Sequence, residues 1–318
     1  MSRSPTRNAN ASSRSSAIRL PSSSRRNEAP TLCREFNEAS QSSLRGAERD
    51  EAILEQARNS GLLRFARNDE NRQVTRRILL LAGTSEARAL AARIAAEGGY
   101  DAVASLAGRT SAPASLALPT RVGGFGGVEG LKRYLEAERI THVIDATHPF
   151  AAQISSNARL ASAALGLPLI VFAREAWRPG ADDNWSVVAD NAAAAKALGE
   201  TPRRVFLTIG RQGVANFRAA PQHDYLLRVI EPPAADDLPP SCEVFSARGP
   251  FTRDDEIALM RKKRIEIVVS KNSGGALTYA KIEAARALGL PVVMIEPPAR
   301  DGVAVLHDLD AVMALLAS

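Results

Sequence analysis

The sequence contains few cysteines and no long apolar run. Its two cysteines, Cys33 and Cys242, are too few for a disulfide framework or a cysteine-rich metal site. No apolar run reaches the roughly 18 residues that a membrane-spanning helix requires. No set of Asp and His residues has the spacing of metal ligands. We therefore expect a cytoplasmic protein that holds no metal and does not enter a membrane.

The formal net charge of +6 comes entirely from the start of the chain. Residues 1–77 contain 15 Arg, no Lys and nine acidic residues, whereas the other 241 residues contain equal numbers of basic and acidic residues. A charge excess confined to one segment gives no indication of a nucleic-acid-binding core. We expect no nucleic-acid partner.

The first 75 residues are predicted to be a disordered extension. Residues 1–27 contain nine Ser, six Arg and no acidic residue, and such a segment cannot bury enough apolar surface to offset the entropy of ordering. A short helix around 48–67 is compatible with the composition there. A transit peptide and a solvated tail are open interpretations. We favour a third, a gene start assigned too early, because a GTG codon at Val74 would begin the chain just before the first predicted strand.

From Ile78 onward, short apolar runs alternate with helical segments rich in Ala, Leu and Arg. Strands are predicted at 78–82, 102–106, 141–145, 169–172, 205–209, 225–229, 265–269 and 292–295. This alternation is typical of α/β folds with doubly wound parallel sheets. A polar stretch over 175–190 interrupts it. The sequence therefore predicts two α/β domains, a cofactor-side domain at 76–178 and a substrate-side domain at 179–318.

A weak internal repeat relates the two predicted domains. A shift of 123 positions lays 143–171 on 266–294 without a gap, and His148 then falls on Lys271. The repeat is either a true duplication or the general likeness of any two βαβ units. In both cases the polar corners occupy the carboxyl ends of strands, where open α/β sheets bind ligands.

A segment suited to binding a pyrophosphate follows the first predicted strand directly. Gly83 permits a sharp turn, Thr84 and Ser85 provide hydroxyl groups, and the next helix begins with unpaired N–H groups. The alternative is that these hydroxyls only cap the helix.

Two further features of the first predicted domain concern a cofactor. Arg109 lies near the end of the second predicted strand, where no acid stands. An acid there binds the ribose of NAD, while Arg accommodates the extra phosphate of NADP. Arg109 therefore favours NADP as the cofactor, and the alternative interpretation is an arginine that is merely solvated. Further on, Gly123, Gly124 and Gly126 surround Phe125, which lets backbone approach a flat ligand or makes a flexible connection.

The stretch from Asp145 to Phe150 closes a strand. Asp145 ends an apolar run, which predicts a buried or cleft-lining carboxylate. His148 is a candidate acid–base group or hydrogen-bond donor, although a His before a Pro also occurs as a simple turn residue.

The second predicted domain has basic residues at several strand ends. Arg211, Lys271 and Arg248 each follow a strand or precede a helix. If the strands are parallel, these side chains point into one cleft, which suits a substrate with several carboxylates.

In this order and spacing, the motifs resemble the precorrin-6A reductase family of cobalamin biosynthesis. The resemblance covers about residues 77–315. It rests on 80–88, 108–110, 121–127, 145–151, 208–212, 247–251, 270–275 and 281–286.

The resemblance implies two flavodoxin-like or Rossmann-like domains with NADPH in the cleft between them. It also implies a substrate: a ring-contracted tetrapyrrole with many carboxylates, precorrin-6A, which is reduced at one double bond to precorrin-6B. The residues expected to hold NADPH are Gly83, Thr84, Ser85, Arg88, Arg109, Gly123, Gly124, Phe125, Gly126 and Thr147. Those expected to hold substrate are Arg211, Gln212, Arg248, Lys271, Asn272, Ser273, Gly274 and Lys281. Asp145 or His148 is expected to act in catalysis, and either of them or water to deliver the proton.

A non-catalytic NADP- or nucleotide-binding module with a basic arm is the alternative. An NADP-linked reductase of a small acid is disfavoured, because the sequence has no Tyr-x-x-x-Lys pair. The choice between a metal-free and a cobalt-containing substrate and the oligomeric state are open from the sequence.

Overall fold

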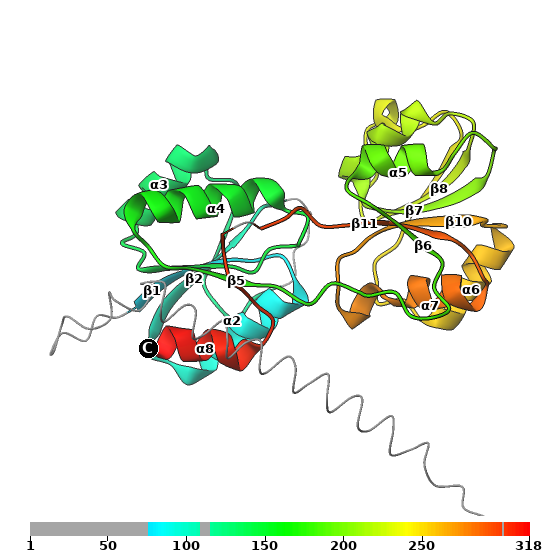
Figure 1. Cartoon of the computed structure of the whole chain (residues 1–318). Helices are drawn as coiled ribbons and strands as arrows, with labels where there is room; N and C mark the ends of the chain where they lie inside the picture. The colour runs from blue at the N-terminus through cyan, green and yellow to red at the C-terminus, as the bar shows by residue number, and fades with distance from the viewer. Residues whose placement is uncertain (1–75, 109–114, 301) are drawn as a thin grey trace, which may run out of the picture. The chain divides into compact units, whose positions relative to one another are not determined.

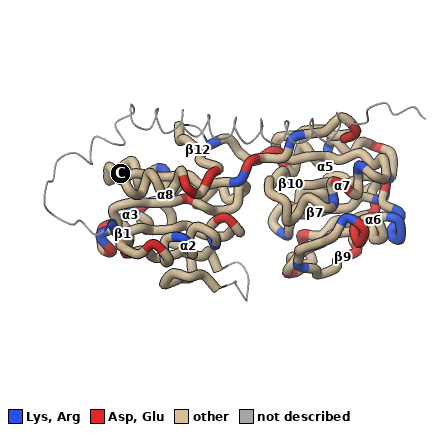
Figure 2. The backbone as a smooth tube through the Cα atoms, turned by 90° about the horizontal axis from the view of Figure 1, so that it is seen from below, with Lys and Arg blue, Asp and Glu red and all other residues tan. Residues whose placement is uncertain are grey.

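The computed structural model describes residues 76–108, 115–300 and 302–318. The predicted extension over 1–75, with its short helix, and Arg109 lie outside the described residues. The described part of the chain forms two α/β domains, each built on a six-stranded parallel sheet (Figure 1). Basic and acidic positions are interspersed along both domains (Figure 2).

The first sheet is buried on both faces by helices. In spatial order its strands are β12 (Val305–Leu306), β5 (Leu169–Phe172), β4 (His142–Asp145), β1 (Arg76–Leu81), β2 (Tyr100–Leu106) and β3 (Thr120–Val122). Helices α2 (Ser85–Glu97) and α8 (Leu309–Ala317) cover one face, and α3 (Gly127–Ala137) and α4 (Ala152–Leu165) cover the other (Figure 1). Because both faces are covered, β1 contains a continuous apolar run, 78–81, in which Ile78, Leu79 and Leu80 are fully buried.

The second sheet has the same construction. Its strands are, in spatial order, β6 (Trp185–Val188), β11 (Val292–Ile295), β10 (Ile267–Lys271), β7 (Arg204–Thr208), β8 (Asp224–Val229) and β9 (Cys242–Ser246). One face is covered by α5 (Asn191–Ala197) and the 3-10 helix η2 (Arg211–Ala219), and the other by α6 (Arg253–Lys262) and α7 (Ala280–Ala287). Two short 3-10 turns, η3 (Ala235–Asp237) and η4 (Ala276–Thr278), lie in the connections.

The two domains exchange their outermost βα units. Strand β6 follows β5 along the chain but pairs with β11 of the second sheet, and β12 follows β11 but pairs with β5 of the first. Each exchanged strand leads into a helix, α5 or α8, that covers its new sheet. The repeated segments 143–171 and 266–294 correspond to β4-α4-β5 and β10-α7-β11, at equivalent places in two sheets of the same strand order. This correspondence favours a true duplication.

The predicted fold class is confirmed, and each of the eight predicted strands is present within two residues at either end. The four strands that the sequence did not predict, β3, β6, β9 and β12, are the four edge strands. Apart from Leu306, every residue of these edge strands is at least partly exposed, so they lack the buried apolar run that marked the inner strands.

The prediction that the second domain extends to residue 318 is wrong for the end of the chain. Strand β12 pairs with β5, and Val312 and Leu316 of α8 are fully buried in the core that α2 also lines. The chain therefore passes from the first domain to the second in a first crossover, 173–184, and returns to the first domain in a second crossover, 296–304. It was missed because no polar stretch as long as 175–190 marks it in the sequence.

Leu316→Ala tests this return. Removing a fully buried Leu side chain leaves a cavity that costs about 2–5 kcal/mol of unfolding free energy. Because the cavity lies in the first domain, amide hydrogen exchange is expected to accelerate in β1 and α2 and not in β10. Leu277→Ala, at a position 53% exposed, is the control. Faster exchange confined to the second domain would contradict the assignment of α8.

Candidate functional site

Each sheet has one point where the order of strands along the chain reverses. In the first sheet this point lies between β1 and β4, and in the second between β7 and β10. Ligands of open parallel sheets bind at the carboxyl ends of the strands beside such a point. The corners after these four strands contain most of the predicted site residues.

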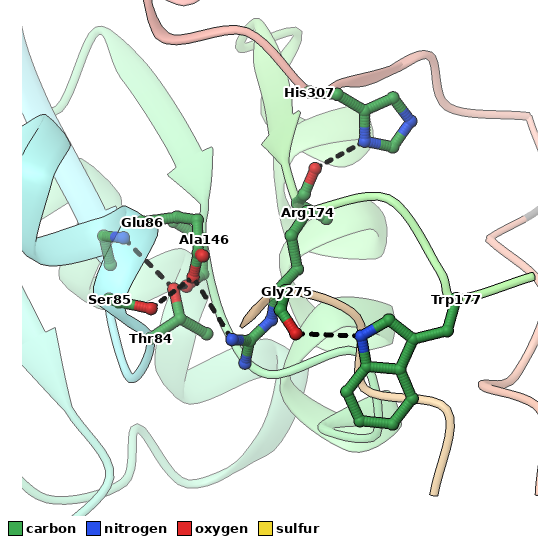
Figure 3. Close-up of polar contacts among 10 residues, drawn as sticks. Thr84, Ser85, Glu86, Ala146, Arg174, Trp177, Gly275 and His307 are labelled. Carbon is green, nitrogen blue, oxygen red and sulfur yellow. Dashed lines mark hydrogen bonds and ion pairs between the residues drawn. The ribbon is translucent and has the colours of Figure 1, made fainter. Parts of the chain in front are cut away.

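Thr84 caps helix α2 and ties the corner after β1 to the corner after β4. Its Oγ1 accepts a hydrogen bond from the Ala87 N–H at 3.1 Å and donates to the Ala146 carbonyl at 3.0 Å (Figure 3). The capping interpretation therefore holds for Thr84. The other N–H groups of the first turn lack intrahelical acceptors, as in any α-helix, so the end of α2 remains suited to an anion.

The neighbours of Thr84 leave this corner open to a ligand. Gly83 is exposed, and a Cβ atom there would meet nothing within 4 Å. The Ser85 hydroxyl donates to Glu86 at 3.0 Å. Arg88 lies one turn further along α2 and is exposed.

Arg121 holds the glycine cluster in place. Its guanidinium donates to the Ser105 hydroxyl at 2.8 Å and to the carbonyls of Gly123 and Gly124 at 3.0 and 3.1 Å. It also lies 4.0 Å from the centroid of the Phe125 ring. These contacts argue against a merely flexible connection, and they cover one face of the Phe125 ring. Gly126, at φ +82°, caps α3 in a left-handed conformation that suits glycine.

Asp145 and Thr147 stabilise the corner after β4. Asp145 is 1% exposed, and its Oδ1 accepts hydrogen bonds from the Thr147 N–H at 3.0 Å and hydroxyl at 2.6 Å. Its Oδ2 lies 3.7 Å from Arg300 of the second crossover. The carboxylate is thus buried, which is one of the two environments that the sequence predicted. Its oxygens are held by Thr147 and Arg300.

His148 is kept neutral by its surroundings. Burial, with the positive charges of Arg174, Lys271 and Arg300, lowers the pKa of His148 to about 4. Its Nδ1 lies 3.2 Å from the Phe150 N–H and accepts from it, so the proton of the neutral ring is on Nε2.

A cavity of about 340 Å³ lies at the carboxyl ends of β7 and β10. The second domain lines it with Ile209, Gly210, Arg211, Gln212, Ile230, Glu231 and Lys271, and the first domain with His148, Phe150 and Ala151. Arg211 pairs with Glu231 at 2.9 Å, and the Lys271 Nζ lies 5.0 Å from the Phe150 ring centroid. The cavity therefore brings four of the predicted residues together: His148, Arg211, Gln212 and Lys271.

Other predicted substrate residues do not line this cavity. Arg248 is exposed in the loop after β9. Asn272 is 1% exposed, and its amide bonds Trp177 twice, accepting from the N–H at 2.8 Å and donating to the carbonyl at 3.0 Å. It also donates to Glu296 at 3.0 Å. Because Trp177 and Glu296 belong to the two crossovers, Asn272 holds both of them at the end of β10.

Ser273, Gly274 and Lys281 are buried beneath the first crossover. A Cβ atom on Gly274 would lie 2.2 Å from the Glu175 carbonyl oxygen, so only glycine fits. The Lys281 Nζ donates to the Thr278 carbonyl at 2.6 Å and lies 4.8 Å from the Trp177 ring centroid. Burial, with the charges of nearby arginines, lowers the pKa of Lys281 to about 7.

Sequence reasoning missed two arginines that face the first-domain corners, Arg174 and Arg300. Arg174 follows a predicted strand by two residues, so the strand-end rule that found Arg211 and Lys271 could have found it. Arg300 carries no such signal, because it lies in a crossover that the sequence did not reveal.

Among the described residues no helix is both long and apolar enough to cross a membrane. The same part of the chain contains no group of three or more His, Cys, Asp or Glu residues arranged to hold a metal ion.

Comparison with known proteins places the chain among reductases. Residues 77–317 match the family model described as precorrin-6x reductase CbiJ/CobK. The chain belongs to this family. A precorrin-6A reductase of Rhodobacter capsulatus is 51% identical over 241 residues, which cover 76% of this chain and 96% of that protein. A cobalt-precorrin-6A reductase of Priestia megaterium is 31% identical over 232 residues, which cover 70% of this chain and 90% of that protein.

A solved structure agrees with the assignment. CobK precorrin-6A reductase matches with a TM-score of 0.71 and 51% identity, covering 76% of this chain and 96% of that one. The predicted family, an oxidoreductase acting on a CH–CH group in cobalamin biosynthesis, is thereby confirmed. A reductase of this family implies a nicotinamide cofactor.

The buried ammonium of Lys281 predicts a pH-dependent stability. In the unfolded chain this Lys has its ordinary pKa near 10.5, against about 7 in the folded protein. Between these values the folded state binds fewer protons, so the unfolding free energy rises with pH through this window. Lys281→Met is expected to remove about 2–4 kcal/mol of that rise, measured by urea unfolding from pH 6 to pH 10. Lys262→Met, at an exposed position of α6, is the control, and an unchanged pH dependence in Lys281→Met would contradict the assignment.

Proposed function

We propose that this chain uses NADPH to reduce one double bond of precorrin-6A to give precorrin-6B. The proposal is carried by one observation: neutral His148 lines the same cavity as Arg211 and Lys271. That cavity adjoins the strand-order reversal of the second sheet and includes the corner after β4 of the first. It therefore offers a place where cofactor and substrate meet. Greater identity to relatives named for precorrin-6A than to those named for cobalt-precorrin-6A favours the substrate without cobalt.

The cofactor fits the first domain on the observations described above. The exposed backbone at Gly83 and the N-terminus of α2 suit the diphosphate, with Ser85 and Arg88 beside it. The backbone of the glycine cluster, held by Arg121, suits the adenosine half. Arg109 is proposed to bind the 2′-phosphate that distinguishes NADPH from NADH. Thr147 shapes the corner at the nicotinamide end through its bonds to Asp145.

The substrate is proposed to bind at the second-domain side of the cavity. Arg211 and Lys271 offer cations for carboxylate arms, and Gln212 offers an amide. Glu231, which pairs with Arg211, is displaced from that guanidinium when a substrate carboxylate binds. Arg248 is an exposed cation for an outer carboxylate. Asn272, Ser273, Gly274 and Lys281 support the Lys271 corner from beneath.

His148 acts as a hydrogen-bond donor. With its pKa lowered to about 4, the ring is neutral at pH 7 and a weak acid, so its Nε2–H orients the macrocycle and does not protonate it. The buried carboxylate of Asp145 positions the corner. We assign the proton to water reaching the cavity.

Most of the rate enhancement is proposed to come from orientation. Bound NADPH supplies a hydride, and that chemistry belongs to the cofactor. The protein holds the two reactants face to face, which can contribute about 7–11 kcal/mol in favourable cases. The other candidate, a non-catalytic nucleotide-binding module, has no comparable support, because the cavity residues suit a second, anionic ligand.

A turnover assay tests the proposal. The expected result is a loss of NADPH absorbance when precorrin-6A is added. Mass spectrometry should then show a product that is two hydrogens heavier than the substrate. Cobalt-precorrin-6A in a parallel arm is expected to react more slowly. NADPH that binds but is not oxidised by either substrate would support the nucleotide-binding module.

Lys271→Met tests the substrate side. Loss of the ammonium is expected to raise the KM for precorrin-6A about tenfold or more, since hydrogen bonds to charged groups contribute about 1.5–3 kcal/mol. The Kd for NADPH is expected to change less than twofold, as measured by cofactor fluorescence. Lys262→Met serves again as the control. A weakened NADPH affinity with normal KM would reverse the assignment of the two domains.

A further inference from the structure

Arg174 opens the first crossover, two residues after β5. Its side chain is only 14% exposed. Figure 3 shows it directed toward Glu86 and Ala146, that is, toward the corners after β1 and β4. The site described above assigns it no task.

The stem of Arg174 lies across the glycines that follow Lys271. A Cβ atom on Gly274 would lie 3.0 Å from its Cγ, and one on Gly275 would lie 2.7 Å from its Cδ. Any larger residue at Gly275 would push the stem away. Trp177 adds to this contact by donating from its indole to the Gly275 carbonyl at 2.8 Å (Figure 3). The stem is thus fixed, and the guanidinium also lies close to Gly275, since the same Cβ atom would lie 3.0 Å from its Nη1.

The guanidinium is incompletely paired. Its Nη1 lies 3.8 Å from the Glu86 carboxylate, an ion pair too long for a hydrogen bond. Its Nε is buried without a hydrogen-bond partner among the described residues. Burying a guanidinium donor without an acceptor is costly, and the pair with Glu86 is long, so the guanidinium retains donors for a stronger acceptor.

The carboxylate of Glu86 lies where we expect that acceptor to bind. It lies in the first turn of α2 and also accepts the hydrogen bond from Ser85. This is the corner to which the diphosphate was assigned. The charge of Arg174 also reaches the corner after β4, since Arg174, with Lys271 and Arg300, lowers the pKa of His148.

We propose that Arg174 binds the diphosphate of the nicotinamide dinucleotide, exchanging Glu86 for phosphate oxygens when the cofactor is present. Arginine matches phosphate geometry with two parallel hydrogen bonds. Glu86 then acts as a stand-in anion that holds the guanidinium in place before the cofactor arrives. The inference rests on the proposed cofactor, and it names a binding residue that the sequence motifs did not include.

The choice of the diphosphate over the 2′-phosphate has a measurable consequence. NADH and NADPH share the diphosphate, whereas only NADPH has the 2′-phosphate. Arg174→Gln is therefore expected to raise the Kd of both nucleotides by the same factor, about tenfold to a hundredfold. Glutamine keeps the Cγ and Cδ atoms that contact Gly274 and Gly275, so the loop beneath retains its packing.

Glu86→Gln provides the converse test. Removing the competing carboxylate is expected to lower the Kd of both nucleotides, and this variant decides the matter if Arg174→Gln does not fold. Arg178→Gln, at an exposed position of the same crossover, is the matched control and is expected to bind as the wild type does. Binding is measured by nucleotide fluorescence, and folding by thermal unfolding.

Three results would overturn the inference. They are an unchanged Kd in folded Arg174→Gln, a loss confined to NADPH, and a raised Kd in Glu86→Gln. Failure of the wild-type protein to bind either nucleotide would instead contradict the proposed cofactor, and the inference with it. The wild-type and variant measurements therefore separate the two claims.

Discussion

The buried amide of Asn272 holds together the two places where the chain passes between domains. It bonds the backbone of Trp177 in both directions and the carboxylate of Glu296. Each crossover supplies the other sheet with its outer βα unit, so both cores depend on where the crossovers run. Because Asn272 directly follows Lys271, the same contact fixes a corner of the candidate site. Stability and site geometry are thus linked through one side chain.

The two domains contribute different chemical groups to the candidate site. The first-domain corners offer helix N–H groups, glycine backbone and a neutral His148, while the second domain offers Arg211 and Lys271 around the cavity. Arg174, which starts in the first crossover and packs against Gly275, spans both sets. The arrangement suits two anionic ligands, a dinucleotide and a polycarboxylate, bound next to each other.

The sequence was sufficient for the inner strands and for the corners that follow them, because buried parallel strands are continuous apolar runs. The edge strands were missed, since their half-exposed residues resemble loops. Strand-end position selected Arg211 and Lys271, which line the cavity, whereas the family resemblance also selected Asn272 and Lys281, which the first crossover buries. Whether a polar residue faces a cavity or a neighbouring segment depends on the path of that crossover. Only tertiary structure reveals it, as the return of α8 to the first domain illustrates.

The cofactor is proposed to bind at the first-domain corners and the substrate at the second-domain side of the cavity. Hydrogen–deuterium exchange with each ligand alone distinguishes this arrangement from the reverse one. NADPH is predicted to protect 83–88 and 123–127 while leaving 209–212 unchanged, and precorrin-6A is predicted to protect 209–212 and 271–275. Protection of 209–212 by NADPH alone, with 83–88 unaffected, would instead place the cofactor in the second domain.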